Sequence, residues 1–345
     1  MPQEVDFAIV GGGFTGLSAA AWLRHLDPQK SVALFEAESV GAGASGRTGG
    51  MTLAESAAGD LPGLGDVLEG FSKVLTALGV DCDLSLPGAW ELGREDARAD
   101  SPINWTDSGK LRVVDEVPGG SADPGKLVSG LARAADRLGA LIFEDSRVEK
   151  IAFDDPLRLD IRGQEVRARR VLLATNAMSL ELNSLANRAA PKFTLAVATA
   201  PITDSQIAKL GLASRRSFYT VDLPYLWGRL LSNNSVICGS GLVHLRHWSE
   251  LDALDVATGV PAELFASIEG RIRNLHPALC SAQFTHRWGG PILFANDWRP
   301  VFARHPKSPR AIVLGAYSGH GVALSVYLGS WAAEVMFGRR DLPDW

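Results

Sequence analysis

The feature that most constrains this chain is a G-x-G-x-x-G pattern at residues 11–16, close to its start. The apolar run at residues 5–10 precedes the glycines and predicts a buried strand, while residues 17–23 are good helix formers. A second apolar run, residues 31–35, ends at Glu36. A strand, a glycine turn, a helix and a second strand with a terminal acid together predict a βαβ unit that binds a dinucleotide.

The three glycines of the pattern and Glu36 have distinct predicted tasks. Gly11 permits the tight turn, Gly13 lets the backbone approach a pyrophosphate, and Gly16 allows close packing of the helix on the strand. The helix that begins near Phe14 would offer free N–H groups to the phosphates. Glu36 would accept hydrogen bonds from ribose hydroxyls and repel a 2′-phosphate. The alternatives are a glycine turn without a ligand and a glutamate that merely ends a strand in solvent, and the full context disfavours both.

The rest of the chain predicts further helices and two kinds of strand. Helical apolar spacing, or the start signal of Asp123 before Pro124, predicts helices at residues 64–78, 124–138, 263–275 and 322–337. Short apolar runs predict strands at residues 83–92, 140–144, 166–175 and 311–314, and residues 94–124 predict loops and edge strands. Turn residues separate three runs that are typical of an antiparallel sheet, residues 193–198, 217–221 and 235–239.

We therefore expect an α/β protein with a discontinuous Rossmann-type domain and an α+β domain built on the antiparallel sheet. A length of 345 residues agrees with two domains. The Rossmann-type domain is expected to comprise residues 1–80, 121–185 and 286–345, and the substrate or cap domain residues 81–120 and 186–285. The ligand would lie beyond the carboxyl ends of the parallel strands.

Two further glycine-rich loops favour a flavin over a nicotinamide dinucleotide. Residues 41–50, GAGASGRTGG, follow Glu36 closely and can fold back over a pyrophosphate and a ring system. Gly49 and Gly50 would remove side chains where a flat ring presses on the backbone. Residues 315–321, GAYSGHG, form a strand-to-helix turn that can direct N–H groups and a helix N-terminus at a flavin carbonyl. A nicotinamide enzyme has no obvious need for this third loop, so FAD is the expected cofactor.

Composition argues against several classes of function. The formal net charge of −5 disfavours a nucleic-acid partner, which would need a basic face. No apolar run approaches the roughly 18 residues of a membrane-spanning helix. Cys82, Cys238 and Cys280 lack metal-binding spacing, and His244 and His247 lack a supporting cluster, so no metal site is expected. Free thiols and the absence of a leader before the first strand favour a cytoplasmic location.

Five segments, in this order, resemble the D-amino-acid-oxidase-like family of FAD enzymes, which includes glycine oxidase, monomeric sarcosine oxidase and γ-glutamylputrescine oxidase. The combination of GASGR-x-GG with SGHGVAL is most similar to the γ-glutamylputrescine oxidase branch. The segments are IVGGGFTGLSAA at 9–20 with Glu36, GAGASGRTGG at 41–50, VLLATNA at 171–177, RWGGPI at 287–292 and LGAYSGHGVALS at 314–325.

This resemblance implies the fold, the cofactor and the reaction. FAD would lie in the Rossmann-type domain, covered by the antiparallel sheet. The substrate, a small amine or amino acid, would pass hydride from its nitrogen-bearing carbon to flavin N5, and water would hydrolyse the resulting imine. The electrons would go to O₂, which gives H₂O₂, or to another electron carrier. The flavin carries this chemistry, and the protein supplies binding and electrostatics.

The sequence also departs from the pattern of its relatives. Sarcosine oxidases have a carboxylate-binding Lys after the third glycine turn, where this chain has residues 322–324, VAL. The strand matched to a Lys that assists oxygen reduction is residues 236–238, VIC. Cys280 precedes the strand that begins at Arg287 and is misplaced for covalent attachment, so non-covalent FAD is expected. The segment between the second glycine loop and residue 120 is shorter than in relatives.

Three residues are predicted to act on the substrate or on the flavin. His320 would face the flavin and influence its electronics, unless it is a turn histidine bonded to backbone. Arg229 would bind a carboxylate bidentately, or form an ordinary surface ion pair. Tyr317, with Trp227 and Trp288, would wall an amine pocket, although each alone is more often a core residue. The predicted FAD contacts are Gly11, Gly13, Phe14, Thr15, Gly16, Glu36, Ala37, Ser45, Gly46, Arg47, Thr48, Gly49, Gly50, Val148, Ala174, Thr175, Asn176, Gly315, Ser318, Gly319, His320, Gly321 and Val322.

Two rival functions share the expected flavin site. The first is a dehydrogenase that passes electrons to a quinone or a carrier, which the missing lysines favour. The second is a flavin-binding subunit without turnover, which the shortened segment before residue 120 favours. The sequence does not distinguish one amine or amino acid from another as the substrate, and it leaves the oligomeric state open.

Overall fold

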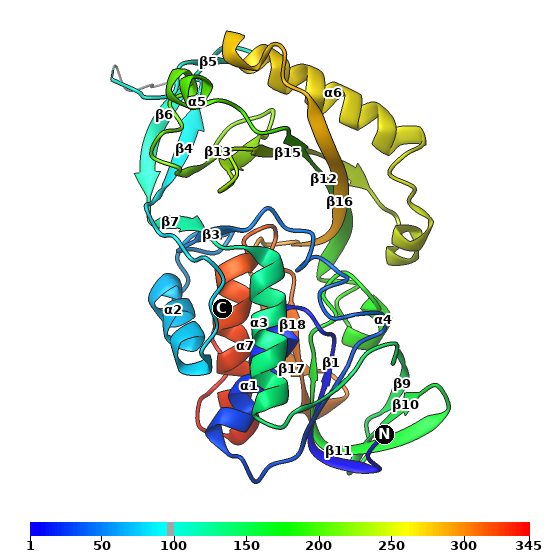
Figure 1. Cartoon of the computed structure of the whole chain (residues 1–345). Helices are drawn as coiled ribbons and strands as arrows, with labels where there is room; N and C mark the ends of the chain where they lie inside the picture. The colour runs from blue at the N-terminus through cyan, green and yellow to red at the C-terminus, as the bar shows by residue number, and fades with distance from the viewer. Residues whose placement is uncertain (95–99) are drawn as a thin grey trace.

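The computed structural model describes residues 1–94 and 100–345 and contains two eight-stranded sheets (Figure 1). The first sheet has the order β17-β18-β11-β1-β2-β8, and β10 and β9 extend it antiparallel from β11. All neighbours from β18 to β8 along this order are parallel, as the βαβ pattern predicts. The strands are β1 (Glu4–Val10), β2 (Val32–Phe35), β8 (Leu141–Phe143), β9 (Val148–Ala152), β10 (Leu157–Ile161), β11 (Gln164–Leu173), β17 (Val301–His305) and β18 (Ser308–Gly315).

Four helices lie over one face of this sheet, where α1, α3 and α7 contact its strands and α2 packs on α7 and α1 (Figure 1). They are α1 (Phe14–Leu26), α2 (Val67–Leu78), α3 (Pro124–Arg137) and α7 (Gly321–Phe337). Gly329 lets α7 approach α1 closely, because a Cβ there would lie 2.6 Å from the carbonyl oxygen of Thr15. The Ser18 hydroxyl donates a hydrogen bond to the Val326 carbonyl at 2.7 Å. The start and the end of the chain are thereby packed into one layer.

The second sheet arches over the carboxyl ends of the first (Figure 1). Its order is β16-β12-β15-β14-β13-β4-β6-β5, and α6 (Gly259–Leu275) covers its outer face together with α5 (Asp204–Leu210). A two-stranded sheet of β3 (Met51–Leu53) and β7 (Gly119–Ser121) lies between the large sheets, and α4 (Leu180–Asn183) follows β11. The strands are β4 (Ala89–Gly93), β5 (Trp105–Thr106), β6 (Lys110–Val117), β12 (Ala189–Thr199), β13 (Ser217–Thr220), β14 (Trp227–Leu230), β15 (Val236–His244) and β16 (Phe284–Ala295).

The expected α/β fold with a Rossmann-type sheet and a separate, largely antiparallel sheet is confirmed. The structure differs from the prediction in one domain boundary, one strand pairing and one hairpin. The expected domain boundary at residue 286 falls within β16, which pairs with β12 in the second sheet. β4 and β13 pair in parallel rather than antiparallel. The β9–β10 hairpin was not predicted as strands, and part of the 94–124 prediction, residues 95–99, lies outside the described residues. Within residues 1–94 and 100–345, no helix combines the length and the apolar character that a membrane span requires.

Candidate functional site

A cavity of about 1290 Å³ lies between the carboxyl ends of the first sheet and the inner face of the second. Its walls come from the turns after β1, β2, β11 and β18, from the second glycine loop, and from strands β12 to β16. This volume exceeds the roughly 300–1,000 Å³ that is typical of a small-molecule site. The cavity therefore has room for a large cofactor and a substrate together.

The turn after β1 is built as the glycine fingerprint predicts. Gly11 has φ +108°, and a Cβ there would lie 2.7 Å from the Ala174 carbonyl oxygen. A Cβ on Gly16 would lie 1.9 Å from the Gly11 carbonyl oxygen. Gly13 is the N-cap of α1 and lacks a side-chain cap, and it lines the cavity together with Phe14 and Thr15 of the first helical turn. A helix N-terminus of this kind suits a pyrophosphate.

Glu36 is fixed at the end of β2, facing the cavity. Its Oε2 accepts a hydrogen bond from the Gly12 N–H at 2.6 Å, and its Oε1 accepts one from the Glu38 N–H at 3.0 Å. These bonds orient the carboxylate and leave further acceptor positions for ribose hydroxyls. Arg147, which the sequence did not single out, also lines the cavity.

In the second glycine loop, other parts of the protein occupy the space beside Gly49 and Gly50. A Cβ on Gly49 would lie 2.1 Å from the indole of Trp227, and a Cβ on Gly50 would lie 2.2 Å from the Ala122 carbonyl oxygen. These contacts give a reason for both glycines that differs from the flat ring expected from the sequence. The loop also reaches the first turn of α1, because the Ser45 hydroxyl accepts a hydrogen bond from the Phe14 N–H at 3.0 Å.

The third glycine loop is held by a set of unusual backbone conformations and buried hydrogen bonds. Asn176, Ala316 and Ser318 all have positive φ, at +46°, +58° and +51°. The Asn176 side chain accepts the Ala316 N–H at 2.9 Å, and the Tyr317 hydroxyl lies 2.7 Å from the Thr15 hydroxyl. Strained non-glycine residues of this kind persist where the surrounding structure holds them and often mark functional sites.

His320 is the N-cap of α7 and lines the cavity. Burial lowers the pKa of its imidazole, so the ring is neutral near pH 7. Within the described residues, its buried Nδ1 has no hydrogen-bond partner, and the same holds for the buried Oγ of Ser325, which also lines the cavity. Buried polar atoms are rarely left unsatisfied. These two atoms and the uncapped end of α7 therefore fit the polar edge of a bound flavin.

The wall that the second sheet contributes is largely aromatic and apolar. Trp227 lies on β14, and Trp288 on β16 donates its indole N–H to the Arg47 carbonyl at 2.9 Å. Tyr219, which the sequence did not single out, donates its hydroxyl to Glu91 at 2.7 Å, and burial raises the pKa of this hydroxyl, which stays protonated. Tyr225 also lines this wall. Period-two alternation along the strands was the signal that could have identified such inward positions.

Most of the predicted site residues line this one cavity, and five do not. Gly16, Gly46, Gly50 and Gly315 lie behind its surface, where they permit backbone packing. The Arg229 side chain is buried beneath the second glycine loop, where its Nε donates to the Gly49 carbonyl at 2.5 Å. The residues that do line the cavity are Gly11, Gly13, Phe14, Thr15, Glu36, Ala37, Ser45, Arg47, Thr48, Gly49, Val148, Ala174, Thr175, Asn176, Tyr317, Ser318, Gly319, His320, Gly321 and Val322.

Neither a metal centre nor a cysteine forms part of the cavity as far as the chain is described. The described residues contain no group of three His, Cys, Asp or Glu side chains that could hold a metal ion. Cys82 and Cys238 are buried and Cys280 is exposed, and the described cavity lining includes none of them.

Comparisons with known proteins agree with this geometry. Gamma-glutamylputrescine oxidoreductase of Escherichia coli strain K12 is 27% identical to the chain, over 98% of this chain and 85% of that protein. The crystal structure of glycine oxidase from Geobacillus kaustophilus has a TM-score of 0.78 at 20% identity, covering 99% of this chain and 97% of that one. L-proline dehydrogenase from P. horikoshii has a TM-score of 0.74 at 17% identity, covering 99% and 96%.

The two solved structures share the fold with this chain at low identity. The match to a family model is more specific, because the DAO model, described as FAD dependent oxidoreductase, covers residues 6–335. That span contains the three glycine loops, both sheets and the cavity between them. The resemblance seen in the sequence is confirmed, FAD is the cofactor, and the chain belongs to the DAO family of FAD dependent oxidoreductases.

Proposed function

We propose that this protein oxidises the C–N bond of a small amine or amino acid and passes the electrons to O₂, which yields H₂O₂. One observation carries the proposal: the N-termini of α1 and α7 meet in one cavity whose opposite wall is an aromatic sheet face. The end of α1 suits a pyrophosphate. The end of α7 suits a ring that gains negative charge when it is reduced.

When bound, FAD supplies a two-electron acceptor that takes hydride from the carbon bearing the nitrogen, leaving an imine that water hydrolyses. The chain's own residues bind the cofactor and orient it. Glu36 accepts hydrogen bonds from hydroxyls at the β2 end of the cavity. His320, held neutral by burial, and Ser325 direct polar atoms at the α7 end.

The substrate must lose the proton of its ammonium group before hydride can leave the adjacent carbon. A cavity wall of aromatic and aliphatic side chains, including Trp227, Tyr225 and Leu242, favours the neutral amine because burial disfavours the charged form. These residues therefore place the amine and favour the loss of its ammonium proton to solvent water, without a dedicated strong base.

The test uses the purified holoprotein. We expect yellow protein whose flavin is bleached under anaerobic mixing with at least one member of a panel of primary amines, secondary amines, and D- and L-amino acids. Admission of air should restore the absorption and release one H₂O₂ for each flavin reduced. Absence of bleaching with every amine would instead favour a flavin-binding subunit without turnover.

A dehydrogenase is the second candidate, and one observation favours it. The described residues that line the cavity include no lysine, which is the residue type that the resemblance implies for oxygen reduction. The rate at which air reoxidises the amine-reduced protein decides between the two. Reoxidation slower than turnover with a quinone acceptor would reject the oxidase and support the dehydrogenase.

A further inference from the structure

The loop between β13 and β14, residues 221–226, exposes apolar side chains at the cavity. Leu223 is 83% exposed, Val221 54% and Tyr225 44%, and all three line the cavity. Contiguous exposed apolar residues on a soluble domain usually mark a binding surface. A loop with such a surface would normally be free to move, which would blur any selectivity that it provides.

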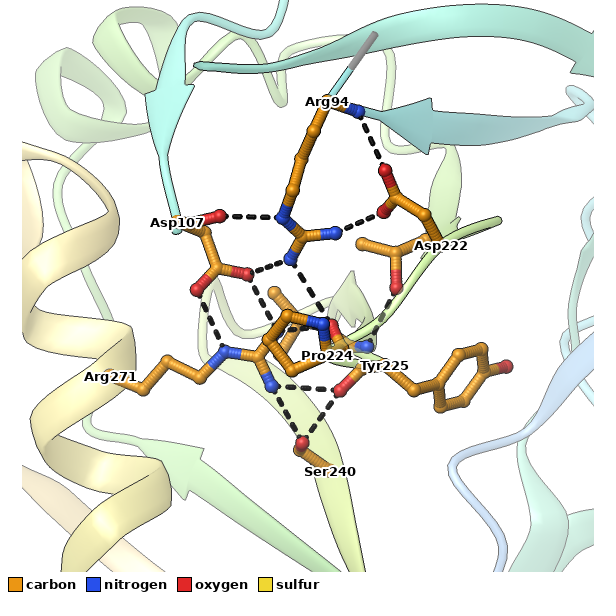
Figure 2. A network of polar contacts seen from close by, with 9 residues as sticks. Arg94, Asp107, Asp222, Pro224, Tyr225, Ser240 and Arg271 are labelled. Carbon is orange, nitrogen blue, oxygen red and sulfur yellow. Dashed lines mark hydrogen bonds and ion pairs between the residues drawn. The ribbon is translucent and has the colours of Figure 1, made fainter. Parts of the chain in front are cut away.

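Four charged side chains hold this loop in place, and Figure 2 shows them arranged around Pro224 and Tyr225. Arg271 on α6 pairs bidentately with Asp107, through Nε at 2.9 Å and Nη2 at 2.6 Å. Arg94, which follows β4, bonds to Asp107 at 2.6 Å and to both carboxylate oxygens of Asp222 in the loop. The Asp107 and Arg94 side chains are only 5% and 10% exposed, so solvent screens these pairs weakly. We call Arg94, Asp107, Asp222 and Arg271 the clamp.

The clamp also holds the loop backbone (Figure 2). Arg271 donates to the Pro224 carbonyl at 2.6 Å and to the Tyr225 carbonyl at 2.8 Å. The hydroxyl of Ser240, which lines the cavity, donates to the same Tyr225 carbonyl at 2.6 Å. Thr220 closes the base of the loop by accepting the Leu226 N–H at 2.9 Å. Two largely buried arginines thus hold the loop backbone from which Leu223 and Tyr225 project.

The chemistry of the fixed surface is apolar rather than acidic. The one carboxylate of the loop, Asp222, is already engaged by Arg94. Glu36 and Glu38, the carboxylates among the described lining residues, belong to the β2 end of the cavity. Because no free anion lies beside Leu223 in that lining, the loop suits a hydrocarbon or aryl group better than a second ammonium group.

We propose that the β13–β14 loop, fixed by the clamp, is a preformed wall that binds an uncharged alkyl or aryl group of the substrate, distal to the nitrogen that is oxidised. The inference rests on the proposed function and names the substrate class within it. Leu223 and Tyr225 are the specificity-determining residues. Arg94 and Arg271 are positioning residues, which act through the loop and do not touch the substrate.

The first experiment compares methylamine, hexylamine and 1,6-diaminohexane by anaerobic rapid mixing. Hexylamine should have a higher kcat/KM than methylamine and than 1,6-diaminohexane. Leu223→Ser should lower the ratio of kcat/KM for hexylamine to kcat/KM for methylamine by about tenfold, as expected when an apolar contact in a pocket is lost. Leu86→Ser is the matched control, because Leu86 is an exposed loop leucine that does not line the cavity. It should leave the ratio unchanged. Equal values for the three amines, or a preference for the diamine, would overturn the inference.

The second experiment tests the clamp by hydrogen exchange and by amine kinetics. Arg271→Lys keeps the charge but loses the bidentate fork. It should speed hydrogen exchange at the amides of Val221 and Leu226 by at least tenfold and reduce the chain-length preference, largely through KM. Arg310→Lys, in the exposed pair with Asp155, is the control and should change neither. Unchanged hydrogen exchange in Arg271→Lys would show that the clamp does not restrain the loop.

The outcomes separate this inference from the proposed function. If amines reduce the flavin without a chain-length preference, the oxidase proposal stands and the apolar wall is refuted. If no amine reduces the flavin, the same amines are equilibrium ligands, and their Kd follows from the shift in flavin absorption. Tighter binding of hexylamine than of methylamine would then support the wall although the proposed reaction has failed.

Discussion

A pair of alanine substitutions in the first glycine loop separates folding from cofactor binding. Gly16→Ala places a Cβ 1.9 Å from the Gly11 carbonyl oxygen, where real Cβ contacts stay beyond 3.0 Å, so the backbone must shift by about 1 Å. Overpacking of this kind costs up to about 3 kcal/mol. Alanine recovers up to about 1 kcal/mol, because glycine is the poorer helix former inside α1. The expected net loss in free energy of unfolding is about 2 kcal/mol.

Gly13→Ala should have the opposite effects, a small change in stability and a large loss of FAD affinity. Its Cβ would lie 2.8 Å from the Ser45 hydroxyl oxygen, a side-chain atom that can rotate away, so stability should change by less than about 1 kcal/mol. The same Cβ would stand at the N-cap of α1, where a pyrophosphate approaches the backbone, so the Kd for FAD should rise by at least tenfold.

Thermal unfolding of the two apoproteins and fluorescence titration with FAD measure both effects. Gly16→Ala should lower the Tm by about 3 °C, and Gly13→Ala should lower it by less than about 1.5 °C. If the Gly16→Ala apoprotein has the same Tm as the wild-type apoprotein, the predicted clash at Gly16 is refuted. Tight FAD binding by Gly13→Ala would refute the phosphate site.

Three further results are expected. Tyr317→Phe should cost about 1–3 kcal/mol in urea unfolding of the apoprotein, because it leaves the buried Thr15 hydroxyl without its 2.7 Å partner; a change below about 0.5 kcal/mol would contradict this. Because burial lowers the pKa of His320 in the folded state, the free energy of unfolding should fall as the pH drops below the unfolded pKa of about 6.5. His320→Gln should make the free energy of unfolding depend less on pH. Parallel pH profiles of the wild type and the variant would contradict this role of His320. Acid precipitation should release all of the FAD into the supernatant, whereas yellow colour retained in the pellet would indicate a covalent bond, for example to Cys280.

The parts of the fold that the sequence predicted are those encoded locally. Gly16 belongs to the same turn as the Gly11 carbonyl that its Cβ would meet, and Glu36 ends β2 within the same βαβ unit. The helices α2 and α3 likewise carry their own signals, with Asp66 and Asp123 as N-caps that accept backbone N–H groups. Local conformation and burial together fix such elements, so one stretch of sequence is enough to identify them.

The parts that the sequence did not predict depend on contacts between distant segments. Arg229 carried a prediction of carboxylate binding, but its Nε bonds to the carbonyl of Gly49, 180 residues away. The clamp joins residues 94, 107, 222 and 271, which share no spacing pattern and meet only after β4, the β13–β14 loop and α6 have packed. A single sequence gives no signal for such a meeting, because neither periodicity nor a motif relates these positions.

The cofactor side of the cavity and the β13–β14 loop are held by different contacts, so substitutions in one need not disturb the other. The cofactor side is fixed by the meeting of the chain's ends, where Tyr317 contacts Thr15 across 302 positions. The β13–β14 loop is fixed by Arg94 and Arg271, which make no contact with the glycine loops among the described hydrogen bonds and ion pairs. Mutations that do not share partners act additively. Substitutions at Leu223 should therefore alter the choice of amine without a matching loss of FAD affinity.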